Sequence, residues 1–202
     1  MNQENTKKSA AHHLLDYVEM FVITVTIVIL LLSFVFRLCV VSGNSMNNTL
    51  LNGEKLVVSN LFYTPDTGDI IVFHQTSDLY DQFNEPIVKR VIATGGEFVC
   101  IDYKANKVYV SADKDFTEDE LLDESAYAHF EGYNGTWREA MFFGSSGVQI
   151  FEVPEGHLFV MGDNRNDSAD SRSVQVGFVD ERRVLGKLLF RLTPFQKFGK
   201  VD

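Results

Sequence analysis

The stretch PIVKRVIAT, residues 86–94, is rich in β-branched residues and has the pattern of a β-strand. Side chains of a strand point alternately to opposite faces, so Ile87, Lys89 and Val91 share one face. Lys89 therefore lies between two apolar neighbours on its own side of the strand. The alternative is a lysine on an edge strand whose ammonium group reaches water.

Similar strand-like runs, separated by turn residues, lie on both sides of this stretch. They are EKLVVSNLFY (54–63), GDIIVFH (68–74), EFVCIDY (97–103), KVYVSA (107–112), VQIFEVP (148–154), GHLFVMGD (156–163) and RRVLGKLLFRLTPF (182–195). The runs 97–103 and 107–112 are separated by a short polar turn, which predicts a hairpin. Together these runs predict a mainly β fold, either a sandwich or a closed barrel.

A long apolar segment precedes the strands. Residues 20–36, MFVITVTIVILLLSFVF, contain no charged residue, and the segment extends over 17–41 if the Arg37 head group reaches the membrane interface. A cleavable signal peptide is the alternative, but its apolar region is usually only about 7–15 residues long, and no convincing A-x-A site follows here. Lys7 and Lys8 precede the segment, which favours a cytoplasmic N-terminus. We therefore expect a cytoplasmic tail (1–16), a transmembrane helix (17–41) and an exocytoplasmic domain (42–202).

The net charge of the 202-residue chain is −10, and residues 1–43 contribute nothing to it because three acidic residues offset three basic ones. Such an acidic domain argues against nucleic acid as a partner. Between residues 113 and 131, eight acidic residues accompany a single Lys114, and Thr117–Glu120 resembles a capping box. We expect a short exposed helix or an ordered loop there, at a solvated surface.

The cysteines and histidines do not have the spacing of a metal site. Cys39 lies in the apolar segment and Cys100 in a distant alternating run, which disfavours a disulfide between them. The histidines show no ligand spacing such as HExxH; they are His12, His13, His74, His129 and His157. We expect no metal and no cofactor.

The run VSGNSMNNTL, residues 41–50, places Ser45 a few residues after the apolar segment. A serine hydroxyl is a poor nucleophile unless a nearby base removes its proton. Neither His74 nor His129 has a local context that indicates such a base. Lys89 is a candidate, because burial lowers a lysine pKa by up to about 3–5 units from about 10.4.

A third polar run, MGDNRNDSADSR, occupies residues 161–172. Asp163, Asp170 and Arg172 are suited to ion pairs that brace a loop, and the Ser168 hydroxyl is suited to orienting an amine. A calcium-binding loop is the competing interpretation. The spacing does not fit an EF-hand, and two arginines interrupt the oxygen ligands.

These segments, in this order behind an apolar N-terminal segment, resemble the type I signal peptidases, which are Ser–Lys membrane proteases that remove signal peptides from exported proteins. SGNSMNNTL (42–50) is similar to the nucleophile motif, GDIIVF (68–73) to a core strand motif, KRVIATGGE (89–97) to the general-base motif and GDNRNDSADSR (162–172) to the signature loop. The short interval between the last two resembles compact Gram-positive members with one anchor. The resemblance implies a signal-peptidase-like β-sandwich or barrel catalytic domain behind one transmembrane helix.

The resemblance implies that Ser45 is the nucleophile and Lys89 its general base, with a hydrogen bond from Ser168 to the lysine amine. Asp170 and Arg172 become structural braces. Gly43 stands where some members carry a side-chain donor, so we expect the Ser45 backbone N–H to bind the oxyanion. The family usually has proline where this chain has Asn48, so one stiffening element of the nucleophile turn is missing.

The substrate implied by the resemblance is a preprotein bearing a signal peptide. We expect its extended end to pair with two strand edges and to place small residues at positions −1 and −3 in shallow apolar pockets. The expected substrate-binding residues are Val41, Ser42, Pro86, Ile87 and Val88. Membrane lipid and transient proximity to the protein export channel are the other expected contacts, with the catalytic domain outside the cell membrane.

Two other classes of function remain as alternatives. The first is a catalytically silent relative that serves as a membrane-anchored binding or assembly protein, although Ser45 and Lys89 are both present. The second is a self-cleaving repressor with similar Ser–Lys chemistry. Such repressors are soluble and carry a DNA-binding module, whereas this chain has an apolar segment in that place.

Overall fold

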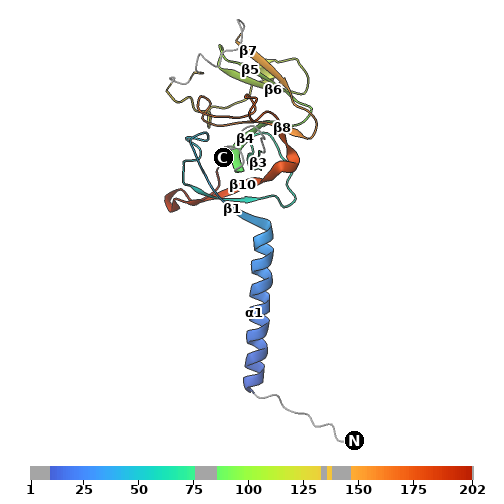
Figure 1. Ribbon diagram of the computed structural model, residues 1–202, viewed down its shortest axis with the longest axis vertical. Helices are drawn as coiled ribbons and strands as arrows, with labels where there is room; N and C mark the ends of the chain where they lie inside the picture. The colour runs from blue at the N-terminus through green and yellow to red at the C-terminus, as the bar shows by residue number, and fades with distance from the viewer. Residues whose placement is uncertain (1–9, 76–85, 133–135, 138–146, 202) are drawn as a thin grey trace, which may run out of the picture. The chain divides into compact units, whose positions relative to one another are not determined.

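The computed structural model describes residues 10–75, 86–132, 136–137 and 147–201 (Figure 1). The chain divides into two compact units, Met1–Arg37 and Leu38–Asp202. The first unit contains helix α1 (Ala10–Val35), and the second contains the β-sheets.

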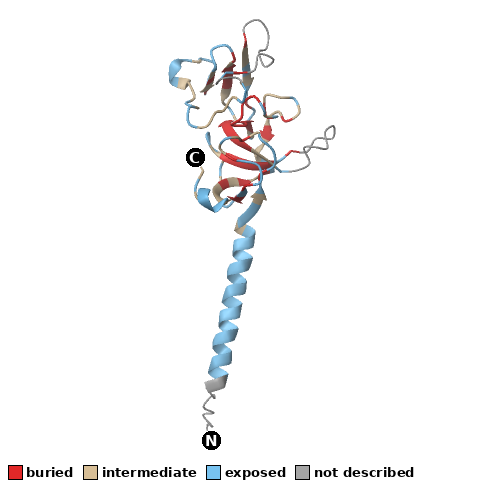
Figure 2. Ribbon diagram, turned by 90° about the vertical axis from the view of Figure 1, so that its left-hand side faces the viewer, coloured by how far each residue is buried: buried red, intermediate tan, exposed pale blue. Residues whose placement is uncertain are grey.

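Helix α1 is apolar and exposed along its length (Figure 2). Its residues His12–Val35 are long and apolar enough to cross a membrane. The hydroxyls of Thr24, Thr26 and Ser33 donate to carbonyls four residues earlier, at 2.7–2.8 Å. These hydroxyls are thus satisfied within the helix, as a lipid environment requires.

The ends of the helix differ from those expected for a span over 17–41. The helix begins at Ala10 and ends at Val35, and strand β1 (Phe36–Val40) takes up the last part of the expected span. Strand β1 is the edge of a sheet next to β2, which provides backbone partners outside a helix. Directly after it, the Val41 N–H donates to the Glu54 carbonyl at 2.9 Å, so the chain is already fixed to the sheet there.

The ten strands of the described residues form a seven-stranded sheet, in the order β1-β2-β10-β3-β4-β8-β9, and a three-stranded sheet, in the order β6-β5-β7. The strands after β1 are β2 (Lys55–Ser59), β3 (Ile70–His74), β4 (Pro86–Ala93), β5 (Phe98–Asp102), β6 (Lys107–Ser111), β7 (Val148–Glu152), β8 (His157–Met161), β9 (Val179–Asp180) and β10 (Val184–Thr193). The mainly β fold class is confirmed. The predicted hairpin is also confirmed, since β5 pairs with β6 in antiparallel register from Phe98↔Ser111 to Asp102↔Lys107.

Strand β4 lies between β3 and β8 in the seven-stranded sheet. It pairs with β3 in antiparallel register, with Ile71 opposite Lys89, whereas its pairing with β8 begins only at Arg90. Val91 and Leu158 belong to one buried apolar cluster, against which Ile87 packs. Lys89 is only 3% exposed, which rules out the alternative of a lysine head group in water.

A short 3₁₀ helix, η2 (Glu118–Glu120), confirms the capping box in the acidic segment. The Thr117 N–H donates to the Glu120 carboxylate at 2.8 Å, and the Asp119 N–H donates to the Thr117 hydroxyl at 3.3 Å. The acidic side chains of this short helix are mostly exposed. The first half of the segment therefore has the predicted solvated character, whereas the second half contacts the site described below.

Candidate active site

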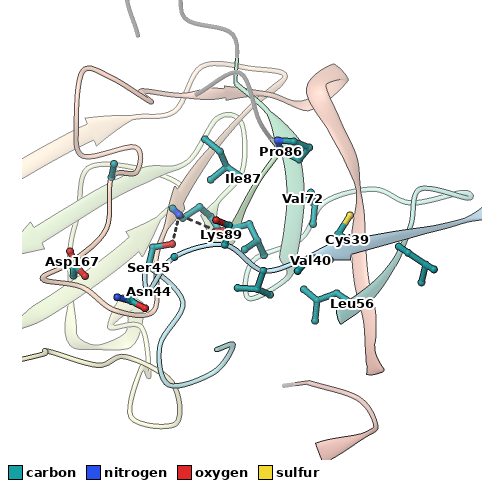
Figure 3. Close-up of a pocket in the computed structure, with 16 residues that line it drawn as sticks. Cys39, Val40, Asn44, Ser45, Leu56, Val72, Pro86, Ile87, Lys89 and Asp167 are labelled. Atoms are coloured by element: carbon teal, nitrogen blue, oxygen red, sulfur yellow. Dashed lines mark hydrogen bonds between the residues drawn. The ribbon is translucent and has the colours of Figure 1, made fainter. Parts of the chain in front are cut away.

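The Lys89 amine and the Ser45 hydroxyl are in direct contact (Figure 3). Lys89 Nζ donates to Ser45 Oγ at 2.7 Å and to the Val88 carbonyl at 3.1 Å. Lys89 comes from β4 and Ser45 from the turn at 44–50, so the fold joins residues 44 positions apart. A lysine amine, and not an imidazole, is thus the titratable group beside the serine.

Burial lowers the pKa of Lys89 from 10.5 to about 8. Of the charges around it, the Asp170 carboxylate raises this pKa, the Arg172 guanidinium lowers it, and the Asp163 carboxylate raises it. Because the pKa is near 8, a useful fraction of the amine is neutral in mildly alkaline solution. A neutral amine has the free electron pair that a base needs.

The turn that carries Ser45 is held by buried apolar side chains and by hydrogen bonds of its own main chain. Met46 and Leu50 are buried in one cluster with Val41. The Asn47 N–H donates to the Asn44 carbonyl at 3.0 Å, and the Leu50 N–H donates to the Met46 carbonyl at 2.8 Å. These bonds give the turn a fixed shape without the proline that the family usually has at position 48.

The Asn164 side chain and main chain connect the signature loop to this turn. The Asn164 N–H donates to the Ser45 carbonyl at 3.0 Å, and its side-chain amide donates to the Asn44 carbonyl at 3.2 Å. Close by, the Thr49 hydroxyl donates to Asp163 at 2.6 Å. The turn that carries Ser45 and the signature loop, which are more than 100 residues apart in sequence, are therefore joined by hydrogen bonds.

Two buried ion pairs brace the signature loop. Arg90, on the face of β4 opposite Lys89, donates to both carboxylate oxygens of Asp163, at 2.8 and 2.9 Å. Arg172 donates to both oxygens of Asp170, each at 2.7 Å. Burial raises the pKa of Asp170, but Arg172 and the Gly162 N–H outweigh this, so that the pKa lies below its usual range. Since both aspartates are paired with arginine, they do not form the calcium site considered as an alternative.

Gly162 allows the loop to approach Ser45 closely. A Cβ atom at this position would overlap the Ser45 carbonyl oxygen and the Ser168 hydroxyl. Any other residue would therefore displace either the backbone of Ser45 or the loop. The role of Gly162 was not predicted from the sequence, although the glycine at the end of an apolar strand is the kind of position where close backbone approach is expected.

The second half of the acidic segment packs against the signature loop, which corrects the expectation of a solvated surface. Glu124 forms an ion pair with Arg165, whose side chain is fully buried. Both main-chain polar groups of His129 are hydrogen-bonded to the signature loop. Its N–H donates to the Asp163 carbonyl and its carbonyl accepts from the Arg165 N–H, each at 2.7 Å. Tyr127 packs against the Arg90 guanidinium, which lies 4.0 Å from the centre of its ring. Buried arginines need compensating groups, and this segment supplies them.

Glu131 extends these contacts to the turn that carries Ser45. Its carboxylate accepts a hydrogen bond from the Asn164 side-chain amide at 2.8 Å. The same amide donates to the Asn44 carbonyl beside Ser45. Sequence reasoning missed Glu124 and Glu131, because each is one of eight similar acidic residues. The aromatic residues interspersed among them were the available signal.

A cavity of about 530 Å³ opens beside Ser45 and Lys89. The residues that were expected to bind substrate all line it, together with Gly43; they are Val41, Ser42, Pro86, Ile87 and Val88. The Val41 main chain is already bonded to residues 53 and 54, and the Gly43 N–H donates to Asn52 at 3.1 Å. In the described part of the chain the main chain of Ser42 makes no hydrogen bond, and residues 86–89 of β4 have no β8 partner. Among the described residues, no strand other than β3 pairs with these two stretches of main chain.

Two further expectations concern the hydrogen bonds at the site. Within the described residues, the Ser45 N–H donates to no group, so it is available to an oxyanion. Gly43 has a φ of +88°, which favours glycine, and it carries no side chain that could donate to an oxyanion. The Ser168 hydroxyl is buried beside Gly162 without a hydrogen bond to Lys89, whose amine is directed at Ser45 and Val88 instead. The expected Ser168–Lys89 bond is thus not made.

Comparison with known proteins identifies the family. The signal peptidase family, peptidase S26, matches residues 14–193. Signal peptidase IB of Staphylococcus aureus is 30% identical to this chain over 190 residues, and the match covers 92% of each chain. Signal peptidase I of Bacillus licheniformis is 32% identical over 202 residues, and the match covers 98% of this chain and 99% of that one. A crystal structure of a signal peptidase I from Enterococcus faecalis is similar with a TM-score of 0.41 and 28% identity, covering 62% of this chain and 97% of that one. The chain belongs to the signal peptidase family, peptidase S26.

The contact between Glu131 and Asn164 gives a first prediction. We expect Glu131→Ala to lower the kcat of peptide-bond cleavage roughly threefold to tenfold with KM little changed, because a charge-assisted hydrogen bond that orients Asn164 is lost. Glu131→Gln keeps an acceptor oxygen and should restore most of the rate. The matched control is Glu118→Ala, which removes an exposed carboxylate of the same segment that pairs with Lys107. Equal effects of the two alanine variants on kcat would contradict the prediction.

Proposed function

We propose that this protein is a type I signal peptidase, a serine endopeptidase that cleaves signal peptides from exported preproteins, with Ser45 as nucleophile and Lys89 as general base. The observation that carries the proposal is the 2.7 Å contact from Lys89 Nζ to Ser45 Oγ, made by a buried lysine whose pKa is lowered to about 8. Family membership and the similarity to signal peptidases over more than nine-tenths of the chain support it.

The reaction begins when the neutral Lys89 amine takes the proton of the Ser45 hydroxyl. The Ser45 oxygen then attacks the scissile carbonyl, and the developing oxyanion accepts a hydrogen bond from the Ser45 N–H. As the C–N bond breaks, the Lys89 ammonium gives its proton to the leaving amine. The acyl chain remains as an ester on Ser45, and Lys89 is neutral again.

Deacylation repeats these steps with water in place of the hydroxyl. Lys89 removes a proton from a water molecule, and the resulting hydroxide attacks the ester carbonyl. The tetrahedral intermediate expels the Ser45 oxygen, which takes the proton back from Lys89. The products are a signal peptide with a free carboxylate and a mature protein with a new N-terminus.

Substrate binding follows from the two open edges of the cavity. The segment before the scissile bond lies extended between residues 41–43 and 86–88, hydrogen-bonded through its main chain to Ser42 and to the free side of β4. Val72 and Ile87, with the other aliphatic side chains of the lining, leave shallow apolar space for the residues at −1 and −3. Small side chains fit such space best.

The apolar helix α1 is a single membrane anchor in this proposal. The N-terminus lies in the cytoplasm and residues 42–202 on the outer face of the cell membrane, since Lys7 and Lys8 precede the helix. Helix α1 ends at Val35, and strand β1 of the seven-stranded sheet follows it directly. Membrane lipid and the neighbourhood of the export channel are then the surroundings in which preproteins reach the site.

The test is cleavage of a preprotein with an A-x-A sequence by the full chain in detergent. We expect one cut after the second alanine with the wild-type protein and none with Ser45→Ala. Replacing the alanine at −1 by phenylalanine should reduce kcat/KM by at least about a hundredfold, because the bulky ring does not fit a shallow pocket. Equal cleavage of the two substrates, or cleavage that survives in Ser45→Ala, would contradict the proposal. A folded wild-type protein that cuts no preprotein would instead support the alternative of a silent binding or assembly protein.

A further inference from the structure

Asp167 is a charged residue of the signature loop that the proposed mechanism does not use. It is exposed and lines the same cavity as Ser45 and Lys89. Its N–H donates to the Asn164 carbonyl at 3.1 Å, which fixes its backbone next to the residue that holds the nucleophile turn. In the part of the chain that the structure describes, its carboxylate forms neither an ion pair nor a hydrogen bond.

The charge of Asp167 is prominent because the rest of the lining is almost uncharged. Among the described residues that line the cavity, Lys89 is the only other charged side chain. Lys89 reacts in its neutral form, so the reactive state of the cavity carries one negative charge. The nearby Asp163 and Asp170 are buried in arginine pairs and present no free carboxylate.

Figure 3 shows on which side of the nucleophile this charge lies. Pro86, Cys39 and Leu56 lie on one side of Ser45, in the part of the cavity with the open strand edges, and Asp167 is drawn on the other side. If the chain before the scissile bond occupies the strand edges, the chain after it leaves toward the signature loop. Asp167 then faces the first residues of the mature protein and the amine that cleavage creates.

We propose that Asp167 determines specificity for charge directly after the cleavage site, favouring basic residues at +1 and +2 and disfavouring acidic ones. The proposal rests on the proposed function and adds a substrate class to it. This class is preproteins in which the first residues of the mature protein are neutral or basic. Attraction between exposed charges is modest, and salt screens it. The kcat/KM values of a Lys substrate and a Glu substrate should therefore differ roughly threefold to tenfold at low salt.

The experiment compares three preproteins that differ only in Lys, Gln or Glu at +1, cleaved by the full chain in detergent. We expect kcat/KM to fall in the order Lys, Gln, Glu for the wild type, and the Lys-to-Glu ratio to approach one in about 1 M salt. In Asp167→Asn the ratio should be near one at low salt, and in Asp167→Lys it should be inverted. Asp119→Asn removes the same charge from the exposed helix η2, outside the cavity lining, and should keep the wild-type ratio.

The ratio separates a specificity role from a loss of stability, because a poorly folded variant loses activity on all three substrates alike. A wild-type ratio near one, a ratio unchanged in Asp167→Asn, or a ratio insensitive to salt would overturn the inference about Asp167. Each of these results still includes Ser45-dependent cleavage, so the proposed function would stand. Failure of the wild-type protein to cleave any of the three preproteins would instead overturn the proposed function.

Discussion

We expect Lys89→Arg and Lys89→Met both to abolish turnover, and Lys89→Met to be more stable than the wild type at neutral pH. Arginine stays protonated throughout the accessible pH range, so it has no electron pair with which to accept the Ser45 proton. Methionine has no basic nitrogen, but its unbranched apolar side chain suits the buried site between Ile87 and Val91. The expected loss in kcat/KM is at least about a thousandfold for either variant.

The gain in stability follows from the lowered pKa of Lys89. The pKa is about 8 in the folded protein and 10.5 in its ordinary state, so the unfolded chain binds more protons between these values. The free energy of unfolding of the wild type therefore rises with pH from about 8 to 10.5. Below pH 8 the buried ammonium lowers stability by about 3 kcal/mol, at about 1.36 kcal/mol per unit of pKa difference. Lys89→Met should be free of this cost at pH 7, and its advantage should shrink as the pH rises.

The same pKa predicts the pH dependence of catalysis. The kcat/KM of the wild type should rise with pH through a midpoint near 8, because only the neutral amine is a base. The measurements are kcat/KM between about pH 6 and 10 and urea unfolding of the wild type and Lys89→Met at pH 7 and pH 10. Near-wild-type turnover by Lys89→Arg, or a rate that falls as the pH rises through 8, would disprove the role of Lys89. If replacing His74, His129 or His157 abolished turnover in a protein that still folds, that histidine and not Lys89 would be the general base.

Much of the fold, and the burial of Lys89, follows from local sequence patterns. The strand period placed Lys89 beside Ile87 and Val91, and the structure buries it there. The hairpin at 97–112 and the capping box at Thr117 depend on residues close together in the chain, and both were predicted. Local patterns are sufficient in these cases because the interacting groups are near neighbours in the sequence.

The contacts that hold the site are long-range, and local patterns did not predict them. Glu124 meets Arg165 and Glu131 meets Asn164, across 41 and 33 positions. The sequence does show that an arginine in an otherwise apolar or tightly packed motif needs a carboxylate partner, but eight acidic residues between 113 and 131 were candidates for that partner. The end of α1 was misplaced for a similar reason, since hydropathy does not distinguish the last turn of a helix from the edge strand β1 that follows it.

The buried pair of Asp170 and Arg172 carries the second large prediction, because it acts both on the stability of the loop and on the base. Asp170 accepts the Gly162 N–H at 3.0 Å and two bonds from the Arg172 guanidinium, so removing either partner leaves a buried charge without its counterion. Breaking such a pair costs about 3–5 kcal/mol. We expect Asp170→Asn and Arg172→Ala each to lower the melting temperature by on the order of 10 °C and to lower kcat/KM with it.

The two variants should move the pH profile in opposite directions, which a loss of stability alone does not do. Asp170 raises the pKa of Lys89, so its replacement by asparagine should shift the midpoint of kcat/KM to lower pH. Arg172 lowers this pKa, so its replacement by alanine should shift the midpoint upward. Arg172→Lys keeps the positive charge, so its stability and its kcat/KM midpoint should lie between those of the wild type and Arg172→Ala. Recovery should be partial because lysine cannot form the two parallel bonds to Asp170. Activity that collapses in either variant at an unchanged melting temperature would refute the bracing role, and shifts of the midpoint in the same direction would refute the electrostatic effect on Lys89.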